Sequence, residues 1–438
     1  MARLFGTDGI RGIVGKELNS ALAWRVGNAL GASIRSEVLI GMDPRASSEM
    51  LANAVAAGLI EAGCDVGIIG VCTTPAVAYL TKRRGAAAGV MISASHNPYE
   101  YNGIKIFGAD GFKLPDVAEE KIEDLVLSGK KTLATGGTGK IIDVKQEKEE
   151  YLNFLKGAFG CRLDGMKIAV DCANGSTADI AKALFEGLGA KCLVIGDKPN
   201  GKNINDSCGS TSLDALKEAV LSGGCELGVA FDGDGDRCLA LDGSGCIVDG
   251  DYIMSILALW LKDEGRLSGN TLVGTVMTNL GLEKFCYENG IGFKRSAVGD
   301  RYVSDMMREA GYSFGGEQSG HIIFGDIATT GDGLLTALAL LSRVKSSKKS
   351  LSDLARVMKK YPQLTVNIPA SKERKSLLGS SEVQSWIDEA KKRLGNGRVL
   401  VCPSGTEPLI RIMVEAESEK LAEDTAGWLA KKINGIPL

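Results

Sequence analysis

A serine beside a histidine is the first group of residues in this sequence that could do chemistry. Ser95 and His96 lie in the run ISASHNP (residues 92–98), directly after an apolar stretch. A hydroxyl next to an imidazole, on a turn fixed by Asn-Pro, is typical of an activated nucleophile. It is not the nucleophile elbow of a hydrolase, because Ser93 and Asn97 replace the two glycines of that motif. A simple turn that caps a strand remains an alternative.

A triplet of aspartates is the second group. The segment DGDGDR carries three carboxylates within five residues: Asp232, Asp234 and Asp236. Carboxylates this close repel one another unless a cation lies between them, and hard oxygen ligands favour Mg²⁺ or Ca²⁺ over zinc. An EF-hand is excluded, because Arg237 occupies its glycine position and Gly243 its final glutamate position. A solvated acidic turn is the alternative, but the apolar run 228–231 before it indicates the edge of a sheet.

A glycine-framed segment, GGEQSGH (residues 315–321), is the third group. Glu317, Ser319 and His321 supply an acceptor, a hydroxyl and a titratable ring, which suit a polyol or an amino sugar. A plain hairpin turn is the alternative. The chain has only two histidines, His96 and His321, which argues against a catalytic triad or a zinc site built from several histidines.

A small turn near the C-terminus is the fourth group. The run PSGTEP (residues 403–408) is followed by Arg411. Small hydroxyl residues and a glycine between two strands expose backbone N–H groups that can bind an anion. The four groups together indicate phosphate chemistry on a polar small molecule, in which positioning and charge neutralisation do most of the catalytic work.

Short apolar runs must position these groups. Runs that end in Gly or Asp alternate with helical patterns of about a dozen residues. The runs expected as strands are 38–41, 89–92, 167–171, 228–232 and 271–274, and helical spacing marks 49–62 and 177–188. This alternation predicts an α/β fold with largely parallel sheets, whose polar residues gather at the carboxyl ends of the strands.

The same pattern divides the chain into four segments. A strand followed by a motif recurs three times, which indicates three related units, whereas the last residues read as a small α+β domain: helix 381–394, strand 398–401, strand 409–414 and a final helix. The domains expected are 1–150 with the serine loop, 151–250 with the aspartate loop, 251–365 with the Glu-Ser-His loop, and 366–438 with the anion-binding turn.

Composition narrows the class of protein. The 438 residues are 44% hydrophobic and 24% charged, with a formal net charge of −3. No net positive field would attract nucleic acid or anionic lipid. The longest apolar run, 253–261, is too short to span a bilayer, and the N-terminus has no signal-peptide core. Eleven scattered cysteines without a Cys-x-x-Cys pair predict a reduced, cytoplasmic protein.

The four motifs, in this order and spacing, resemble the α-D-phosphohexomutase superfamily over essentially the whole chain. Within it, the sequence is most similar to the bacterial phosphoglucosamine mutases. That similarity lies in FGTDGIRG (residues 5–12), NIN (203–205) with CGST (208–211), VGDRYV (298–303), and Gln318, where glucose and mannose mutases usually carry Met.

The resemblance implies three related α/β domains, with mixed and mostly parallel sheets, and a smaller α+β domain around a central cleft. By motif match, Ser95 is the phosphoserine and also a ligand of one Mg²⁺ per chain, together with Asp232, Asp234 and Asp236. Arg11, Lys105 and Arg237 would stabilise the transferring charge, and Lys105 and His321 are the candidates for general acid and base. The residues expected to bind substrate are His96, Arg237, Asp300, Arg301, Glu317, Ser319, Ser404, Gly405, Thr406 and Arg411.

The implied reaction interconverts glucosamine 6-phosphate and glucosamine 1-phosphate through a 1,6-bisphosphate, and supplies precursors of UDP-N-acetylglucosamine and the cell wall. A glucose or mannose phosphate mutase is the nearer alternative, and a non-catalytic sugar-phosphate sensor the remote one. One position departs from the family: Cys402 stands where the phosphate loop ordinarily begins with Arg. Relatives are often homodimers, but the sequence itself does not determine the oligomeric state.

Overall fold

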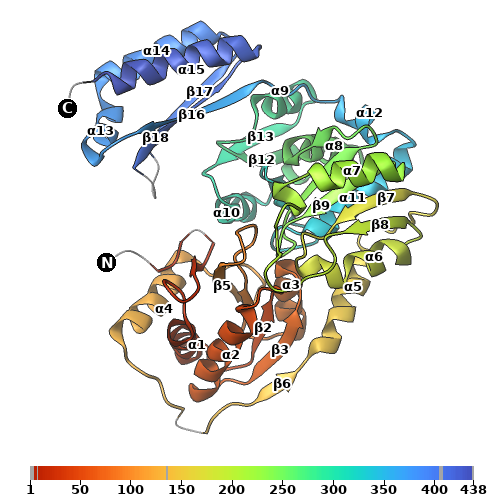
Figure 1. The fold of residues 1–438 in the computed structure, drawn as a ribbon, viewed down its shortest axis with the longest axis vertical. Helices are drawn as coiled ribbons and strands as arrows, with labels where there is room; N and C mark the ends of the chain where they lie inside the picture. The colour runs from red at the N-terminus through yellow and green to blue at the C-terminus, as the bar shows by residue number, and fades with distance from the viewer. Residues whose placement is uncertain (1–3, 7, 135–136, 404–407, 437–438) are drawn as a thin grey trace. The chain divides into compact units, whose positions relative to one another are not determined.

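The structure is a computed structural model that describes residues 4–6, 8–134, 137–403 and 408–436. The described chain forms four β-sheets with helices between their strands (Figure 1). It divides into two compact units, one of Met1–Met277 with Ile291–Val357 and one of Thr278–Gly290 with Met358–Leu438. The predicted α/β class is confirmed. In the described part of the chain, no helix has both the length and the apolar composition needed to cross a membrane.

The first sheet of the larger unit has six strands. They are β1 (Ile10–Ile13), β2 (Val38–Met42), β3 (Val66–Val71), β4 (Ala88–Ile92), β5 (Tyr101–Gly108) and β6 (Ile141–Asp143). Their order is β1-β5-β4-β2-β3-β6. The strands β4, β2, β3 and β6 pair in parallel, whereas β5 runs antiparallel to both β4 and β1. The helices around it are α1 (Ser20–Ile34), α2 (Ser48–Glu61), α3 (Thr74–Arg84) and α4 (Asp116–Ser128).

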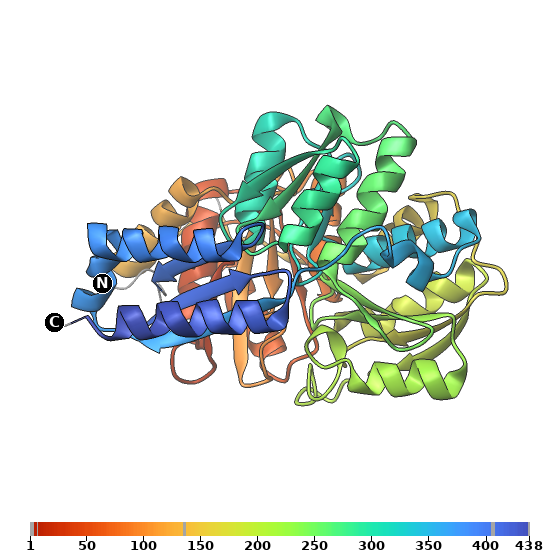
Figure 2. The same ribbon diagram turned by 90° about the horizontal axis from the view of Figure 1, so that it is seen from above.

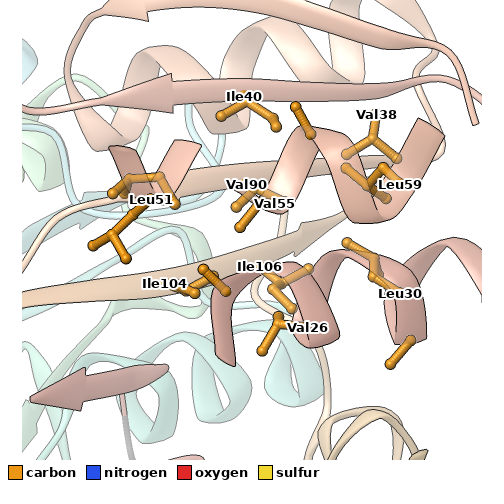
Figure 3. Packing of buried hydrophobic residues seen from close by; sticks show 14 of the residues in the cluster. Val26, Leu30, Val38, Ile40, Leu51, Val55, Leu59, Val90, Ile104 and Ile106 are labelled. Carbon is orange, nitrogen blue, oxygen red and sulfur yellow. The ribbon is translucent and has the colours of Figure 1, made fainter. Parts of the chain in front are cut away.

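Two helices bury their apolar faces on this sheet. Figure 3 shows Val26 of α1 and Val55 of α2 among the buried side chains of β2, β4 and β5. Each aliphatic side chain buried in this way contributes about 1.5–3 kcal/mol. The two helices approach closely at Gly27, where an added Cβ would lie 2.1 Å from the Val55 carbonyl oxygen. The core therefore fixes β2 and β4, whose carboxyl ends carry polar loops.

Helix α3 begins next to the aspartate loop, and capping residues determine where it begins and ends. The Thr73 side chain accepts a hydrogen bond from the backbone N–H of Ala76, and Pro75 lies in the first turn. The helix ends at Gly85, which is in the left-handed region with φ 72°. These caps place Thr74 at the helix start, where it contacts the aspartate loop.

The second sheet has five strands in the order β11-β10-β9-β7-β8. They are β7 (Lys167–Asp171), β8 (Lys191–Ile195), β9 (Leu227–Phe231), β10 (Cys238–Asp242) and β11 (Ile247–Val248). The helical elements before and between these strands are η1 (Lys145–Glu147), α5 (Lys148–Gly157), η2 (Ser176–Asp179), α6 (Ala181–Gly187), η3 (Gly209–Thr211) and α7 (Asp214–Gly223). The helix expected over 177–188 is thus a 3₁₀ turn followed by a short α-helix.

The third sheet has four strands in the order β13-β12-β14-β15. They are β12 (Thr271–Thr275), β13 (Gly292–Ser296), β14 (Phe314–Gly316) and β15 (Ile322–Phe324). The helical elements of this region in the larger unit are α8 (Gly250–Asp263), η4 (Ser268–Asn270), α10 (Asp300–Ala310), α11 (Gly333–Ser347) and α12 (Leu351–Ala355).

Three hairpins occupy equivalent places in these three sheets. In each sheet a strand with a parallel neighbour, β4, β9 or β14, is followed by an antiparallel strand, β5, β10 or β15. The turns between them carry the serine, aspartate and Glu-Ser-His motifs, respectively. This shared topology confirms the prediction of three related units.

The smaller unit contains a three-stranded antiparallel sheet in the order β16-β18-β17. Its elements are α9 (Leu280–Glu288), β16 (Gln363–Pro369), α13 (Lys372–Ser376), η5 (Leu377–Gly379), α14 (Ser381–Leu394), β17 (Arg398–Pro403), β18 (Leu409–Glu415) and α15 (Glu419–Asn434). Helices α14 and α15 contact each other and pack on this sheet (Figure 2). The helix–strand–strand–helix order expected from the sequence is confirmed.

Candidate active site

The Ser95 side chain lies in the turn between β4 and β5 and faces the aspartate loop. Its residue is buried, with 1% of its surface exposed, and its φ of 53° is in the left-handed region. The Oγ hydroxyl donates to Asp232 Oδ2 at 2.6 Å and lies 3.3 Å from His96 Nδ1. The serine and aspartate motifs, far apart in the sequence, therefore meet directly.

The three aspartates of the second hairpin turn are buried and close together. One carboxylate oxygen from each of Asp232, Asp234 and Asp236 lies within 4.8 Å of the others. Within the described residues, Asp234 Oδ1 and Asp236 Oδ1 are buried and accept no hydrogen bond. Buried carboxylate oxygens without a donor need a cation, and this set of oxygen ligands fits Mg²⁺.

Burial and neighbouring groups shift the pKa values of Asp232 and Asp234 in opposite directions. Burial, together with Asp236 and Asp234, raises the pKa of Asp232 well above its usual value. Burial also opposes ionisation of Asp234, but Lys105 and a hydrogen bond from Thr74 outweigh it and lower that pKa. Lys105 Nζ lies 2.8 Å from Asp234 Oδ2 and 3.5 Å from Asp236 Oδ2. Despite its burial, these carboxylates raise the pKa of Lys105 and keep it charged.

A chain of ion pairs extends from this centre. Lys105 Nζ lies 3.1 Å from Asp8 Oδ2, and Asp8 also pairs with Arg11 and with Lys113. Lys113 pairs in turn with Asp300, at the start of α10. The pKa of Asp8 is lowered, because its three cationic neighbours outweigh the effect of burial.

A cavity of about 610 Å³ opens beside these groups, a volume in the range that holds small-molecule ligands. Many of the residues that the sequence singled out line it: Arg11, His96, Asp236, Arg237, Asp300, Glu317, Gln318, Ser319 and His321. Ser95, Lys105 and Asp232 are buried and contact residues of this lining, and Asp234 is buried against Lys105. The structure thus gathers most of the predicted site.

The two histidines face this cavity in different ways. Burial, followed by the cations Arg237 and Arg11, lowers the pKa of His96 to about 4, so its ring is neutral at physiological pH. His321 is 3% exposed, and neither ring nitrogen has a hydrogen-bond partner in the described part of the chain. Its Nε2 lies 3.5 Å from Asp300 Oδ2. His321 is therefore placed to exchange a proton with a ligand.

The third hairpin presents its side chains to the cavity. Glu317 Oε1 accepts a hydrogen bond from the backbone N–H of Gly299, at 3.1 Å. Gln318 Nε2 donates to Asp249 Oδ2 at 3.2 Å, and the Gln318 carbonyl accepts from the Gly250 N–H. These bonds tie the turn to the start of α8 and to the residue before α10.

Some predicted site residues are not gathered here. Arg301 does not line the cavity: its guanidinium pairs with Glu119 at 3.0 Å and with Asp116, both on α4. This placement gives no support to a substrate contact. Arg411 lies on β18 of the smaller unit, directly opposite Cys402 on β17. Ser404, Gly405 and Thr406 lie outside the described residues.

Sequence reasoning missed several residues that hold the site. Thr74 donates to Asp234 Oδ2 at 2.5 Å, and Lys113 links Asp8 to Asp300. Asp43 and Arg45 directly follow β2, and the rule that polar residues gather after strands would have found them. Asn205, which also contacts the serine loop, lies in the NIN run that was noted only as a resemblance.

Comparison with known proteins agrees with this arrangement. Four family models match, described as phosphoglucomutase/phosphomannomutase alpha/beta/alpha domain I over residues 2–133, domain II over 149–245, domain III over 249–361, and the C-terminal domain over 342–432.

Curated relatives match over the full length. The phosphoglucosamine mutase of Caldicellulosiruptor bescii is 49% identical over 448 residues, covering 99% of each chain. That of Geobacillus thermodenitrificans is 49% identical over 429 residues, or 96% of each chain. That of Mycobacterium tuberculosis is 47% identical over 446 residues, or 99% of each chain.

Solved structures share the fold at low identity. A phosphoglucomutase/phosphomannomutase family protein from Burkholderia thailandensis has a TM-score of 0.81 at 23% identity, covering 99% of this chain and 98% of that chain. The Aspergillus fumigatus N-acetylphosphoglucosamine mutase, solved with GlcNAc-6P and magnesium, has a TM-score of 0.70 at 18% identity, covering 98% and 95%. With four domain models in order and relatives alike from end to end, this chain belongs to the phosphoglucomutase/phosphomannomutase family, as the motifs predicted.

Proposed function

We propose that the chain is a phosphoglucosamine mutase that interconverts glucosamine 6-phosphate and glucosamine 1-phosphate through phosphorylated Ser95. The observation that carries the proposal is the direct bond from Ser95 Oγ to Asp232, in a buried carboxylate cluster beside a cavity of ligand size. The full-length relatives named phosphoglucosamine mutase support this choice of sugar.

A magnesium ion fits the cluster. Asp232, Asp234 and Asp236 would hold it, together with an oxygen of the phosphate on Ser95. When bound, the ion neutralises charge on the transferring phosphoryl group. The Aspergillus structure with magnesium supports this assignment by analogy.

The transfer breaks the bond between phosphorus and Ser95 Oγ, which keeps the electron pair, while a sugar hydroxyl oxygen forms the new bond to phosphorus and loses its proton. We assign His321 as the group that takes this proton, because its ring nitrogens are buried beside the cavity and have no hydrogen-bond partner among the described residues. Lys105 is a weaker candidate for this step, because its neighbours keep it charged. Lys105, Arg11 and Arg237 would instead balance the negative charge that builds up during transfer.

The sugar would bind between the three hairpins. Glu317 would accept hydrogen bonds from its hydroxyls and Ser319 would donate to them, and His96 and Asp300 line the same cavity. The intermediate, glucosamine 1,6-bisphosphate, must turn end over end so that its other phosphate returns to Ser95. Ser404, Gly405, Thr406 and Arg411 are the residues we assign to the non-reacting phosphate, on the resemblance alone.

The place of this reaction in the cell follows from its product. Glucosamine 1-phosphate is a precursor for UDP-N-acetylglucosamine and the cell wall. Seven of the eleven cysteines are buried as free thiols, which suits a reducing compartment and supports the cytoplasm as its location.

Turnover on a panel of sugar phosphates tests the proposal. Purified protein with Mg²⁺ is assayed on the 6-phosphates of glucosamine, N-acetylglucosamine, glucose and mannose. We expect the highest kcat/KM on glucosamine 6-phosphate, by about tenfold or more, because a pocket built to bond one polar substituent rejects its replacement. A higher kcat/KM on glucose or mannose 6-phosphate would establish the alternative mutase, and no turnover on any sugar would overturn the mutase function.

A further inference from the structure

We propose that Arg45 and Asn205 are positioning residues that hold the phosphoserine loop in register with the aspartate loop. The inference rests on the proposed function. Its basis is that both side chains donate to the same two backbone oxygens, the carbonyls of Ser95 and Asn97. One donor comes from the first sheet region and the other from the second.

The Arg45 guanidinium donates hydrogen bonds to backbone carbonyls of the serine loop. Its side chain is fully buried. Nη2 donates to the Ser95 and Asn97 carbonyls, each at 2.8 Å. Nη1 donates to the Tyr101 carbonyl at 3.2 Å and to the Pro98 carbonyl. A single planar group therefore fixes four carbonyls along the turn between β4 and β5.

Asp43 fixes the guanidinium in turn. Its Oδ2 accepts from Arg45 Nε at 2.8 Å and from Ser93 Oγ at 2.6 Å, and its Oδ1 accepts from Ser48 Oγ at 2.8 Å. Ser93 Oγ also accepts the Ser95 N–H, at 2.9 Å. A buried charge pair with further hydrogen bonds of this kind has little freedom to move.

Asn205 approaches the same carbonyls from the second sheet region. Its Nδ2 donates to the Ser95 carbonyl at 2.9 Å and to the Asn97 carbonyl at 3.1 Å. Its own N–H donates to the Ala173 carbonyl at 2.9 Å, just beyond β7. Its φ of 57° is in the left-handed region, which asparagine tolerates better than most residues.

The aspartate loop touches the same point. A Cβ added at Gly233 would lie 2.6 Å from the Ser95 carbonyl oxygen and 3.0 Å from Asn205 Nδ2. The aspartate loop thus packs directly on the Ser95 carbonyl that Arg45 and Asn205 hold. We call these two donors the clamp. The clamp therefore sets the position of one loop relative to the other.

This registration matters because Ser95 is held in an uncommon backbone conformation. The left-handed region is unfavourable for a residue with a Cβ such as serine, so the surrounding bonds must maintain it. With the Ser95 carbonyl fixed, its Cβ direction is fixed, and Oγ remains 2.6 Å from Asp232. Phosphoryl transfer is sensitive to such geometry, since misplacement by about 1 Å can cost on the order of 100-fold in rate.

The test is Asn205→Asp, which keeps the size and the tolerance of a positive φ but removes the donor. We expect kcat to fall by about 10- to 100-fold, with KM and melting temperature close to those of the wild type. The matched control is Asn203→Asp, in the same segment, where Nδ2 donates to the Lys198 carbonyl and to no other group among the described residues. A general loosening of the segment would lower kcat in both variants. Loss of the hydrogen bonds to the Ser95 and Asn97 carbonyls would lower kcat in Asn205→Asp alone.

A second variant, Arg45→Lys, keeps the charge but can reach fewer carbonyls. We expect its kcat to fall further than that of Asn205→Asp, again with KM unchanged. A wild-type kcat in Asn205→Asp, or an equal fall in Asn203→Asp, overturns the inference. Wild-type protein that turns over none of the four sugar phosphates overturns the proposed function, and this inference with it. Active wild-type protein with an unaffected Asn205→Asp variant overturns the inference alone.

Discussion

The two loops of the reaction centre and the Glu-Ser-His loop are equivalent hairpin turns, yet they are built differently. In the turns after β4 and β9, Ser95 and the three aspartates are buried, and Ser95 donates a hydrogen bond to Asp232. In the turn after β14, Glu317 and Ser319 face a cavity of about 610 Å³. The equivalent turns therefore serve two purposes. The first two meet in a buried reaction centre, whereas the third presents its side chains to the cavity.

The difference indicates how the chemistry and the choice of sugar are separated. The reaction centre is assembled by contacts between the first two related units, such as the ion pair of Lys105 with Asp234. The recognition turn is tied to Gly250, Gly299 and Cys238 through hydrogen bonds, while Glu317 and Ser319 face the cavity and can exchange partners with a ligand. Substitutions in the first should reduce kcat, and substitutions in the second should raise KM.

The largest effect is expected for Ser95→Ala. Loss of the phosphate carrier should reduce mutase activity by at least about 1,000-fold. The protein should still fold, with a modestly lower melting temperature, because buried Asp232 loses its hydrogen-bond donor. Steady-state kinetics measure the activity, and the intact mass shows whether the protein carries phosphate. Retained activity in this variant would contradict the phosphoserine mechanism and the contrast between the two regions.

A smaller but still large effect is expected for Asp234→Asn. Removing one of three carboxylates should weaken Mg²⁺ binding and lower kcat by about 100-fold or more, because metal charge stabilisation is worth several kcal/mol. Mg²⁺ at 100 times its Kd should stabilise the wild-type protein by about 2.7 kcal/mol and the variant much less.

Thermal melts with and without Mg²⁺ check this expectation. The exposed carboxylate variant Asp197→Asn serves as the control and should respond to Mg²⁺ as the wild type does. An equal Mg²⁺ response in Asp234→Asn would mean that the cluster does not hold the ion.

A moderate effect, on KM rather than on kcat, is expected for Glu317→Gln. The amide keeps the size and the acceptor for the Gly299 N–H but loses the charge. KM should rise by about tenfold, the value of a charged hydrogen bond, while kcat stays within about threefold. A kcat as low as that of Asp234→Asn would show that the recognition turn belongs to the reaction centre.

His96 belongs to the serine turn and also lines the cavity. Its lowered pKa should make the stability of the protein depend on pH. Burial and nearby cations lower its folded pKa to about 4 from an ordinary value of 6.5. The unfolded chain therefore binds more protons between these values, so the stability due to neutral His96 is lost as pH falls from 6.5 towards 4. Urea melts of His96→Gln at pH 7 and pH 5 should show a smaller loss than the wild type; an equal loss would contradict the shift.

The smallest effect is expected for Cys402→Arg in the smaller unit. A guanidinium at the family position should lower KM by about two- to fivefold, as for an exposed ion pair. The gain is limited because Arg411 lies directly opposite on β18, and like charges in a cross-strand pair repel. An unchanged or higher KM would show that the phosphate site is complete without it.

The sequence predicted the strands and the turn positions well, because apolar runs such as 38–41 and 167–171 report burial directly. It also predicted the aspartate cluster, whose members are neighbours in the chain. It did not predict Arg45 or Asn205, whose roles depend on contacts across 50 and 110 residues. A motif match placed Arg301 at the substrate; the structure shows its guanidinium paired with Glu119 on α4, and its contact with substrate stays a prediction.

The central claim is that Ser95 carries a phosphoryl group and gives it to the sugar. The most direct measurement is the intact mass of the phosphorylated protein, with peptide mapping, before and after a single turnover with glucosamine 6-phosphate. We expect one phosphoryl group on the peptide that contains Ser95, and its loss as the 1,6-bisphosphate forms. An active protein that never carries phosphate on Ser95 would contradict the account.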